Sequence, residues 1–599
     1  MELPEALAFL EIETLPSILS IYKFFLGLLS LFNDNSKYYK PSFEIKEGQV
    51  FDYLVVGAGS AGAVVANRLT EIGNITVLLI EAGGIPPEAS NVPALFPLID
   101  RNKYDWNFYT TNDEFTSQAH ATKNIHVAQG KMLGGSSSLN YMSYVRGSKE
   151  DYNGWASMGN KGWEWKNVLK YFMKSERLDD VDIITGSSGN LHSTKGPITV
   201  TRTNWGPRTQ HLFEAFSENY PILLDVNGPV QVGYSMAQFA TNNNIRQSTA
   251  VSYLRDLKYR NNFYLLLNSL VTKIFFSRNN RAVALEILMQ NQRKINIGVR
   301  KEIIVCAGAI NSPKLLLLSG IGPYYHLQKL KINVVVNSPK VGQNLQDHVL
   351  VPVQISGKEG YSSIIQNIDY ITNLDKFPNP VLTGRIALDK SQTYPDYQSY
   401  VLPFPIGSLI SGLLCQVGFE LNKDVCAEAI KACLSGESVF AVIALLHPES
   451  RGSVNLVDNN PTTPPLIHSG YYSDTRDLER HAFYMEDYVR LINTTYFRNI
   501  KSKVVNYNLK QCNQFKFLSH EYWKCHVLNL GSTMWAHSGT CAMGPNGVVD
   551  ARLRVRGVKG LRIVDASIMP KVVGANLYAA ILMIAEKAAD MIKEDTYKF

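Results

Sequence analysis

Apolar and polar residues form a strand–turn–helix–strand pattern near the start of the chain. The apolar run from Tyr53 to Val56 has the length of one buried strand. From about Ser60, small and apolar residues continue as in a helix packed on a sheet. A second apolar run, Val77 to Ile80, predicts a further strand. The pattern therefore predicts an α/β unit within the first hundred residues.

The turn between the first strand and the helix has the spacing G-x-G-x-x-G. The first glycine of this motif allows a tight turn, the second lets the backbone approach a pyrophosphate, and the third lets helix and strand pack closely. Glu81 ends the second apolar run. Its position is close to that of the carboxylate that binds a ribose hydroxyl in dinucleotide-binding proteins. We therefore expect a dinucleotide site that includes Gly57, Ala58, Gly59, Ser60, Gly62 and Glu81.

Later apolar runs extend this sheet and close the chain. Leu265–Phe276 and Ala282–Ile287 predict strands, and Val305–Pro323 predicts a strand, a turn and an apolar helix. An amphipathic helix is expected from about Ala579 to Lys593. Between about 355 and 530 the pattern changes to isolated strands and loops with many prolines, which indicates a second domain inserted into the first.

The expected domain organisation follows from these changes of pattern. Residues 1–48 form an N-terminal segment, and 49–355 belong mainly to the first domain, with about 200–245 contributing to the second. Residues 356–530 form mainly the second domain, and the chain returns to the first domain at 531–599.

The N-terminal segment carries an apolar run, Phe24–Phe32, of the size found in a signal peptide. Its flanks are unusual, because the residues before it are acidic and no small-residue cleavage site follows. We favour an atypical export signal over a helix retained on the surface. Two Asn-x-Ser/Thr sequons, at Asn74 and Asn493, are compatible with export. Lys23 and Pro16 argue against a stable membrane span.

Charge and cysteine content narrow the function classes. The net charge of +7 is small for 599 residues, and the basic residues are scattered, so a nucleic-acid partner is not expected. The seven cysteines show no metal-ligand spacing, and their odd number leaves at least one free thiol. Cys306 lies in an apolar run and is expected to be buried. Cys512 and Cys525 are either a disulfide, if the protein is exported, or reduced surface cysteines.

Two further stretches carry candidate chemistry. Gly130–Asn140 is too rich in glycine and serine for a helix or a central strand, and its many donors suit a loop around a polar cofactor. His537 opens a glycine-containing loop, and Asn576 follows Gly574. By position alone, His537 could equally be structural, and Asn576 could be a turn residue.

The motifs together resemble the glucose–methanol–choline (GMC) family of flavin oxidoreductases, from about residue 50 to 595. Besides the glycine turn, the matching segments are Gly130–Asn140, Gly308–Pro323, Val341–His348, His447–Gly452 and His537–Gly544. The resemblance implies an α/β fold, α+β overall, with a Rossmann-like FAD-binding domain and an interleaved substrate-binding domain built on a six-stranded antiparallel sheet.

The resemblance also implies the cofactor and the roles of individual residues. FAD rather than NAD is expected, and by position it would also contact Trp106, Gly135, Ser137, Asn140, Val271 and Asp565. His537 matches the catalytic histidine of the family, and Asn576 matches its partner. An imidazole can remove the proton of an alcohol while an amide N–H steadies the developing alkoxide. The flavin then accepts the hydride.

Three positions depart from common family patterns. Leu139 stands where some members carry a histidine bonded to FAD, so non-covalent FAD is expected. Tyr141 and Tyr578 replace a common glycine and asparagine near the expected substrate pocket.

Tyr394–Gln398 and Leu445–Gly452 resemble the insect ecdysone oxidases, which oxidise the 3-hydroxyl of an ecdysteroid with O2 and release hydrogen peroxide. The competing hypotheses are a glucose dehydrogenase-like enzyme with a quinone acceptor, a non-redox FAD-containing lyase, and a non-catalytic flavin-binding protein.

Overall fold

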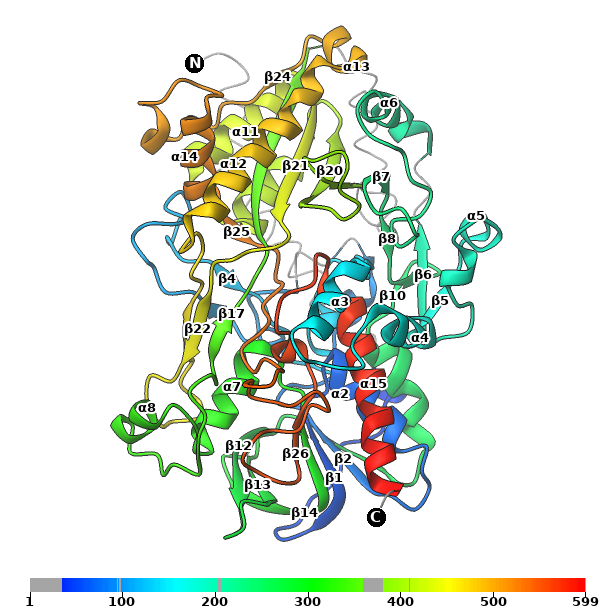
Figure 1. Cartoon of the computed structure of the whole chain (residues 1–599), viewed down its shortest axis with the longest axis vertical. Coiled ribbons are helices and arrows are strands. Elements are labelled where there is room, and N and C mark those ends of the chain that lie inside the picture. Colours follow the sequence, from blue (N-terminus) through cyan, green and yellow to red (C-terminus); the bar gives the residue numbers. More distant parts are fainter. Residues whose placement is uncertain are drawn as a thin grey trace.

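The computed structural model describes residues 35–93, 95, 99–202, 206–358, 381–408 and 410–597. Figure 1 shows two regions, one around strands β1, β14 and helix α15, the other around strands β20, β21 and β24. The apolar run Phe24–Phe32 lies outside the described residues, so the expected signal peptide stays a prediction. Within the described ranges, no helix is both long and apolar enough to cross a membrane.

The first region is built on a mixed sheet in the order β11-β2-β1-β14-β13-β12, with β26 paired to β14. Strands β11, β2, β1, β14 and β26 run parallel, whereas β12, β13 and β14 form an antiparallel meander. The strands are β1 (Val50–Val56), β2 (Val77–Ile80), β11 (Phe263–Leu266), β12 (Leu270–Phe276), β13 (Ala282–Leu288), β14 (Lys294–Val305) and β26 (Leu561–Ile563).

Two helices cover the parallel part of this sheet. Helix α2 (Ser60–Leu69) follows β1 directly, and most of its residues are buried. The closing helix α15 (Leu577–Tyr597) packs beside α2 (Figure 1), where the Arg68 guanidinium lies 2.5 Å from the Glu586 carboxylate. The predicted strand–turn–helix pattern is therefore confirmed. The contact between α2 and α15 brings together segments that lie far apart in the sequence.

The predicted strand Leu265–Phe276 is two strands in the structure. Strand β11 ends at Leu266 and β12 begins at Leu270. Between them Asn268 adopts a left-handed φ of 50°, a conformation that asparagine tolerates better than most residues and that turns the chain. The break lets the chain leave a parallel pairing with β2 and enter the antiparallel pairing with β13.

The second region is an antiparallel sheet in the order β24-β18-β21-β20-β19-β7, with the short β25 paired to β18. The family resemblance implied six strands; the structure has these six in one continuous order plus β25. The strands are β7 (Gly233–Met236), β18 (Val349–Gly357), β19 (Leu382–Ile386), β20 (Tyr397–Phe404), β21 (Glu437–Leu445), β24 (Lys503–Val504) and β25 (Ser532–Thr533).

Alternate side chains of β20 face opposite sides of this sheet. On one side the ring of Tyr397 stacks on Tyr484 of helix α12, at a centroid distance of 5.1 Å. On the other side the hydroxyl of Tyr400 reaches Asn576 in the first region. Helices α11 (Lys423–Ser435), α12 (Thr475–Val489) and α14 (His520–Leu530) contribute buried side chains to the core of the second region.

The other main elements lie around the two sheets. They are α3 (Lys149–Ser157), α4 (Trp165–Ser175), α5 (Val181–Thr185), α6 (Gly206–Ser217), α7 (Gly308–Leu318), α8 (Tyr324–Lys329), α10 (Ile410–Leu413), α13 (Thr495–Asn499), β3 (Phe108–Tyr109), β4 (His126–Val127), β5 (Glu176–Leu178), β6 (Ile198–Arg202), β8 (Gln238–Phe239), β17 (Gln343–Leu345), β22 (Gly452–Asn455) and β23 (Leu466–His468).

Two disulfides lie in the second region. Cys512–Cys525 is the pair that the sequence left open, and the structure resolves it as a disulfide. Cys415–Cys426, which the sequence did not single out, is a second one. Cys306 is buried, as predicted, and its thiol is free.

Candidate functional site

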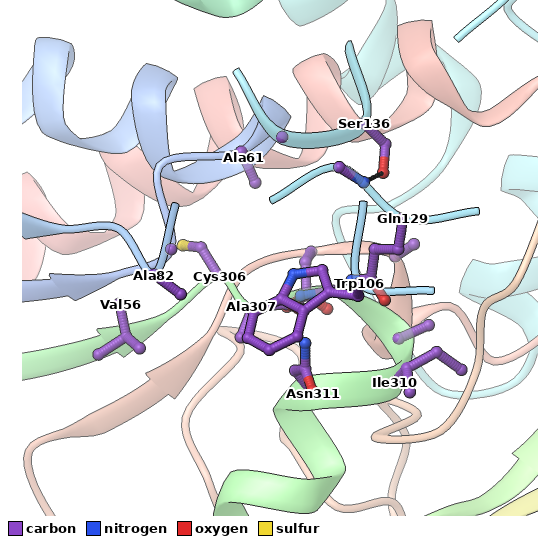
Figure 2. A pocket seen from close by; sticks show the side chains of 18 of the residues that line it. Val56, Ala61, Ala82, Trp106, Gln129, Ser136, Cys306, Ala307, Ile310 and Asn311 are labelled. Carbon is purple, nitrogen blue, oxygen red and sulfur yellow. Dashed lines mark hydrogen bonds between the residues drawn. The ribbon is translucent and has the colours of Figure 1, made fainter. Parts of the chain in front are cut away.

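An open cleft lies at the carboxyl ends of the parallel strands in the first region. Its empty volume is about 1300 Å³, and residues at the ends of β1, β2 and β14 line it. Figure 2 shows the indole of Trp106 inside the cleft, with Ala61 and Ser136 to one side and Ile310 and Asn311 to the other. The lining includes nine of the residues singled out from the sequence: Gly57, Gly59, Ser60, Glu81, Trp106, Gly135, Val271, His537 and Asp565.

The three glycines of the turn have different surroundings. Gly57 has a φ of 95°, and a Cβ there would lie 2.6 Å from the carbonyl oxygen of Cys306. A Cβ on Gly62 would lie 1.9 Å from the carbonyl oxygen of Gly57. A Cβ on Gly59 would meet only the Cα of Gly135, at 3.7 Å. The protein itself therefore requires the first and third glycines, whereas Gly59 borders open space.

The N-terminus of helix α2 faces this open space without a side-chain cap. Its N-cap residue is Gly59, which has no side chain to bond the first N–H groups of the helix. Unbonded N–H groups and the helix dipole together favour an anion such as a diphosphate. The donors and the room beside Gly59 therefore fit the pyrophosphate of FAD.

Glu81 ties the glycine turn to the end of β2. One carboxylate oxygen accepts the N–H of Ala58 at 2.8 Å, and the other accepts the N–H of Gly83 at 2.9 Å. Burial raises the pKa of Glu81 to about 7, and these two backbone donors act against the rise. The carboxylate also lines the cleft. The ribose contact predicted for Glu81 would thus be additional to a structural role that the spacing did not reveal.

Asp565 has a similar joining role at the opposite wall of the cleft. One of its oxygens accepts the N–H of Gly308 at 2.9 Å and the hydroxyl of Ser312 at 2.5 Å. The other accepts the N–H of Ser567 at 2.8 Å. Burial raises the pKa of Asp565 above its usual range. The carboxylate therefore fixes the start of α7 to the segment after β26.

The remaining predicted cofactor residues do not line this cleft. Ala58 is fully buried, and its N–H bonds Glu81. Gly62 faces the turn rather than the cleft. Ser137 and Asn140 line a second cavity instead. Arg246, which the sequence analysis missed, donates to the carbonyl of Asn140 at 2.6 Å and holds this loop.

The second cavity, with an empty volume of about 890 Å³, adjoins the first. Asn576, Tyr141 and Tyr578 line it. The two cavities share Ser60, Ala128, Ser136, Trp535, Leu577 and Ile581. His537 lines the first cavity and Asn576 the second, so the two predicted catalytic residues lie on adjoining spaces.

His537 lies beside a fixed carboxylate. Its Nε2 is 3.5 Å from an oxygen of Asp347. The same oxygen accepts the hydroxyls of Thr533, at 2.5 Å, and Tyr471, and the other oxygen accepts the N–H of Ala536 at 2.8 Å. Asp347 belongs to the matched segment Val341–His348, but the sequence gave no reason to single it out.

The side chain of Asn576 is fixed by two hydroxyl groups. Its carbonyl oxygen accepts hydrogen bonds from the hydroxyl of Tyr400 and, at 3.3 Å, from that of Ser143. Neither residue was predicted. The only signal in the sequence is the alternation along β20, which places Tyr400 and Tyr397 on opposite faces.

The two predicted pocket tyrosines form part of the wall. The ring of Tyr141 lies 5.0 Å from that of Trp535, at an angle of 51°. Tyr578 is buried and donates its hydroxyl to the carbonyl of Gln247 at 2.8 Å. Val401 and Phe404, on strand β20, line neither cavity and pack in the core of the second region.

The position of Leu139 fits a non-covalent cofactor. Its side chain is buried with Ile99 and Met132, and an aliphatic group cannot form a bond to a flavin. In the part of the chain that the structure describes, no group of three or more His, Cys, Asp or Glu side chains is placed to hold a metal ion.

Comparison with known proteins identifies the family. The N-terminal family model of the GMC oxidoreductases matches residues 51–350, and its C-terminal counterpart matches 448–585. The ecdysone oxidase of Spodoptera littoralis is 36% identical over 568 residues, which cover 93% of each chain. The glucose dehydrogenase (FAD, quinone) of Drosophila melanogaster is 32% identical over 596 residues, 96% of this chain and 93% of that relative.

Solved structures agree with this assignment. The pyridoxine 4-oxidase from Mesorbium loti superposes with a TM-score of 0.75 at 26% identity, covering 90% of this chain and 98% of that one. The predicted fold class is therefore confirmed, and so is FAD as the cofactor. The chain belongs to the GMC oxidoreductase family and is an FAD-dependent oxidoreductase that acts on CH–OH groups.

Proposed function

We propose that this protein oxidises the 3-hydroxyl of an ecdysteroid to a ketone, with His537 as the base and Asn576 as the donor to the alkoxide. The observation that carries the proposal is that these two residues line adjoining cavities, one of which contains the glycine turn. The shared lining includes Trp535, two residues before His537, and Leu577, which follows Asn576, so an alcohol bound where the cavities meet would lie near both segments.

The protein residues supply the proton chemistry. The imidazole of His537 takes the hydroxyl proton, so that negative charge develops on the substrate oxygen. The side-chain NH2 of Asn576 donates a hydrogen bond to that oxygen and stabilises the charge. Bound FAD would supply the acceptor for the hydride of the carbon that bears this oxygen, and O2 would reoxidise the flavin with release of hydrogen peroxide. The substrate thus loses one proton and one hydride and becomes a ketone.

One part of the second cavity's wall offers apolar surface to a large substrate. Leu139, Met142, Met534 and Trp535 line it together with polar residues such as Asp100, Asn140 and Ser143, and the hydroxyl of Tyr578 is already bonded to the backbone. A steroid needs a roomy apolar pocket with few polar groups, whereas a sugar needs a polar partner on every side. The relative named ecdysone oxidase, 36% identical, supports the same substrate class.

A glucose dehydrogenase-like enzyme with a quinone acceptor is the second candidate, favoured by the 32% identity to the fly glucose dehydrogenase. Anaerobic bleaching of the flavin separates the two. We expect ecdysone to bleach it at micromolar concentration and glucose to fail at millimolar concentration. Oxygen uptake with ecdysone then tests the acceptor. If glucose bleaches the flavin as efficiently as ecdysone does, an ecdysteroid is not the specific substrate. If no alcohol bleaches the flavin, a lyase is favoured.

We also propose that the protein is secreted. Two disulfides are typical of an oxidising compartment, and both sequon asparagines, Asn74 and Asn493, are exposed. Expression of the full chain in insect cells should place it in the medium, with a mass that falls after enzymatic removal of N-glycans. Retention of unglycosylated protein inside the cells contradicts the proposal.

A further inference from the structure

Three distant segments meet at the side-chain amide of Asn576. Its carbonyl oxygen accepts hydrogen bonds from the hydroxyl of Tyr400, on β20 of the second region, and from Ser143 at 3.3 Å. The two hydroxyls are themselves 2.7 Å apart, and since each has a single proton, the Ser143 proton is shared between the Tyr400 oxygen and the amide oxygen. Ser143 lines the second cavity together with Asn576. The amide oxygen is therefore bonded to the protein, and Asn576 also lines the cavity.

The orientation of this amide decides its chemistry. A side-chain amide has an acceptor oxygen on one arm and two N–H donors on the other. If the oxygen faced the substrate, its lone pairs would repel the developing alkoxide. When the oxygen is held by two hydroxyls, the NH2 group must face the other way. The contacts of Asn576 therefore select the arrangement that can stabilise an oxyanion.

The hydroxyl of Tyr400 remains a donor at neutral pH. Desolvation raises the pKa of Tyr400 to about 12, while the hydrogen bond with Ser143 and the positive charge of Arg385 act in the opposite direction. Arg385 is buried on the neighbouring strand β19, diagonal to Tyr400 in the register of the two strands. A protonated phenol donates readily to an amide carbonyl.

We propose that Tyr400 and Ser143 are positioning residues, which lock the amide of Asn576 with its NH2 group toward the substrate oxygen. The inference rests on the proposed function of Asn576 as donor to the alkoxide. It assigns the second region a part in the chemistry itself, beyond shaping the pocket. Docking of β20 against the segment that carries Asn576 is then required for the donor to be oriented.

Strand β20 supplies a matched control. Tyr397 is a buried tyrosine three residues before Tyr400, on the opposite face of the same strand, and its hydroxyl donates to the carboxylate of Asp487 at 2.7 Å. Tyr397→Phe removes a buried hydroxyl from the same strand without touching Asn576. A general loss of sheet stability would affect both variants, whereas loss of the amide orientation affects only Tyr400→Phe.

The test is anaerobic stopped-flow reduction of the FAD-loaded protein by a substrate alcohol. We expect Tyr400→Phe to lower the limiting rate of flavin reduction about tenfold and Ser143→Ala about threefold, since each removes one hydrogen bond from the amide. The apparent dissociation constant of the alcohol should change less than about twofold. Before it loses its proton, the hydroxyl of the substrate can donate to the oxygen of the Asn576 amide or accept from its NH2 group. Tyr397→Phe should retain the rate of the unmodified protein.

A double-mutant cycle with Asn576→Ala shows whether Tyr400 acts through the amide. In that background, Tyr400→Phe should slow reduction by less than about twofold further. A full tenfold loss there, or an equal loss in Tyr397→Phe, overturns the positioning role. So does a Tyr400→Phe variant with an unchanged limiting rate while the unmodified protein is reduced normally. If no alcohol reduces the unmodified protein, the proposed function itself fails and the inference fails with it.

Discussion

The cofactor end and the substrate end of this protein are built in different ways. At the glycine turn of the cofactor cleft the supporting contacts lie close together in sequence, as in the hydrogen bonds that the N–H groups of Ala58 and Gly83 donate to Glu81, whereas Asp565 joins the opposite wall through distant residues. At the substrate end, Asn576 is held by residues that lie 176 and 433 positions away in the chain. The first end depends on local backbone geometry, and the second depends on how two sheets dock. Substitutions at the two ends should therefore affect the protein in different ways.

The largest effects are expected at the glycine turn. Gly59→Val should abolish FAD binding while the chain still folds, because only the Cα of Gly135 lies near the new Cβ and the branches extend into the space for the pyrophosphate. Gly62→Ala should destabilise the fold by about 3 kcal/mol or more, since its Cβ would lie 1.9 Å from a backbone oxygen. Flavin absorbance and circular dichroism of the two variants separate these outcomes.

The matched reference is the unmodified protein after removal of FAD. Gly59→Val should have the same circular dichroism spectrum and thermal midpoint as this apoprotein. A Gly59→Val protein that remains yellow contradicts the placement of the pyrophosphate. A Gly62→Ala protein as stable as the unmodified chain contradicts the close approach of helix and strand.

The next largest effect should come from the proposed catalytic base, His537. His537→Ala should lower the rate of flavin reduction by about 10²–10⁴, the usual range for a general acid–base group. FAD content should stay normal, because the histidine lines the cleft but belongs neither to the glycine turn nor to its supports. Stopped-flow reduction and the ratio of flavin to protein absorbance measure both. A full reduction rate, or loss of flavin, contradicts the assignment.

The same contrast explains what the sequence could predict. The glycine turn, Glu81 and helix α2 were predictable because their spacing fixes their geometry within one strand–turn–helix unit. Tyr400 and Ser143 were not, because no local pattern reports that a strand of one sheet will reach Asn576 in another region. For the same reason, the partner of Cys415 could not be read from spacing alone.

Other differences between the predicted and the observed structure are local, but the pattern of apolar residues does not report them. The break at Asn268 splits an apolar run that reads as one strand, because one left-handed residue changes direction without changing hydrophobicity. His537 and Asn576 came from the family resemblance, since neither position is distinctive by itself.

Disulfides extend the comparison to stability. Both pairs lie in the second region, so reduction should weaken the substrate end first. Replacing Cys512 and Cys525 with serine should cost about 3 kcal/mol, a typical value for a short closed loop, and lower the thermal midpoint of this region by roughly 5–10 °C. Thermal denaturation followed by tryptophan fluorescence measures the shift.

Dithiothreitol is the control for this experiment. It should lower the midpoint of the unmodified protein more than that of the double serine variant, which retains only Cys415–Cys426. A midpoint of the unmodified protein that does not respond to the reductant contradicts a stabilising role for both disulfides.

The smallest effect should be at Tyr578, where a change of side chain tests the substrate end alone. Its hydroxyl bonds the carbonyl of Gln247, so its ring, rather than its polar group, forms the cavity wall. Tyr578→Phe keeps the ring and should leave the apparent affinity for a steroid within about twofold. Tyr578→Asn removes the ring and should weaken ecdysone about tenfold, a loss of roughly 1.4 kcal/mol, which is within the range for burying an aromatic face. A small alcohol does not reach this wall and should change less than about threefold. Titration of anaerobic flavin bleaching gives the apparent affinity of each variant for ecdysone and for the small alcohol. Equal losses for ecdysone and the small alcohol in Tyr578→Asn would mean that the ring supports the fold of the site rather than the substrate.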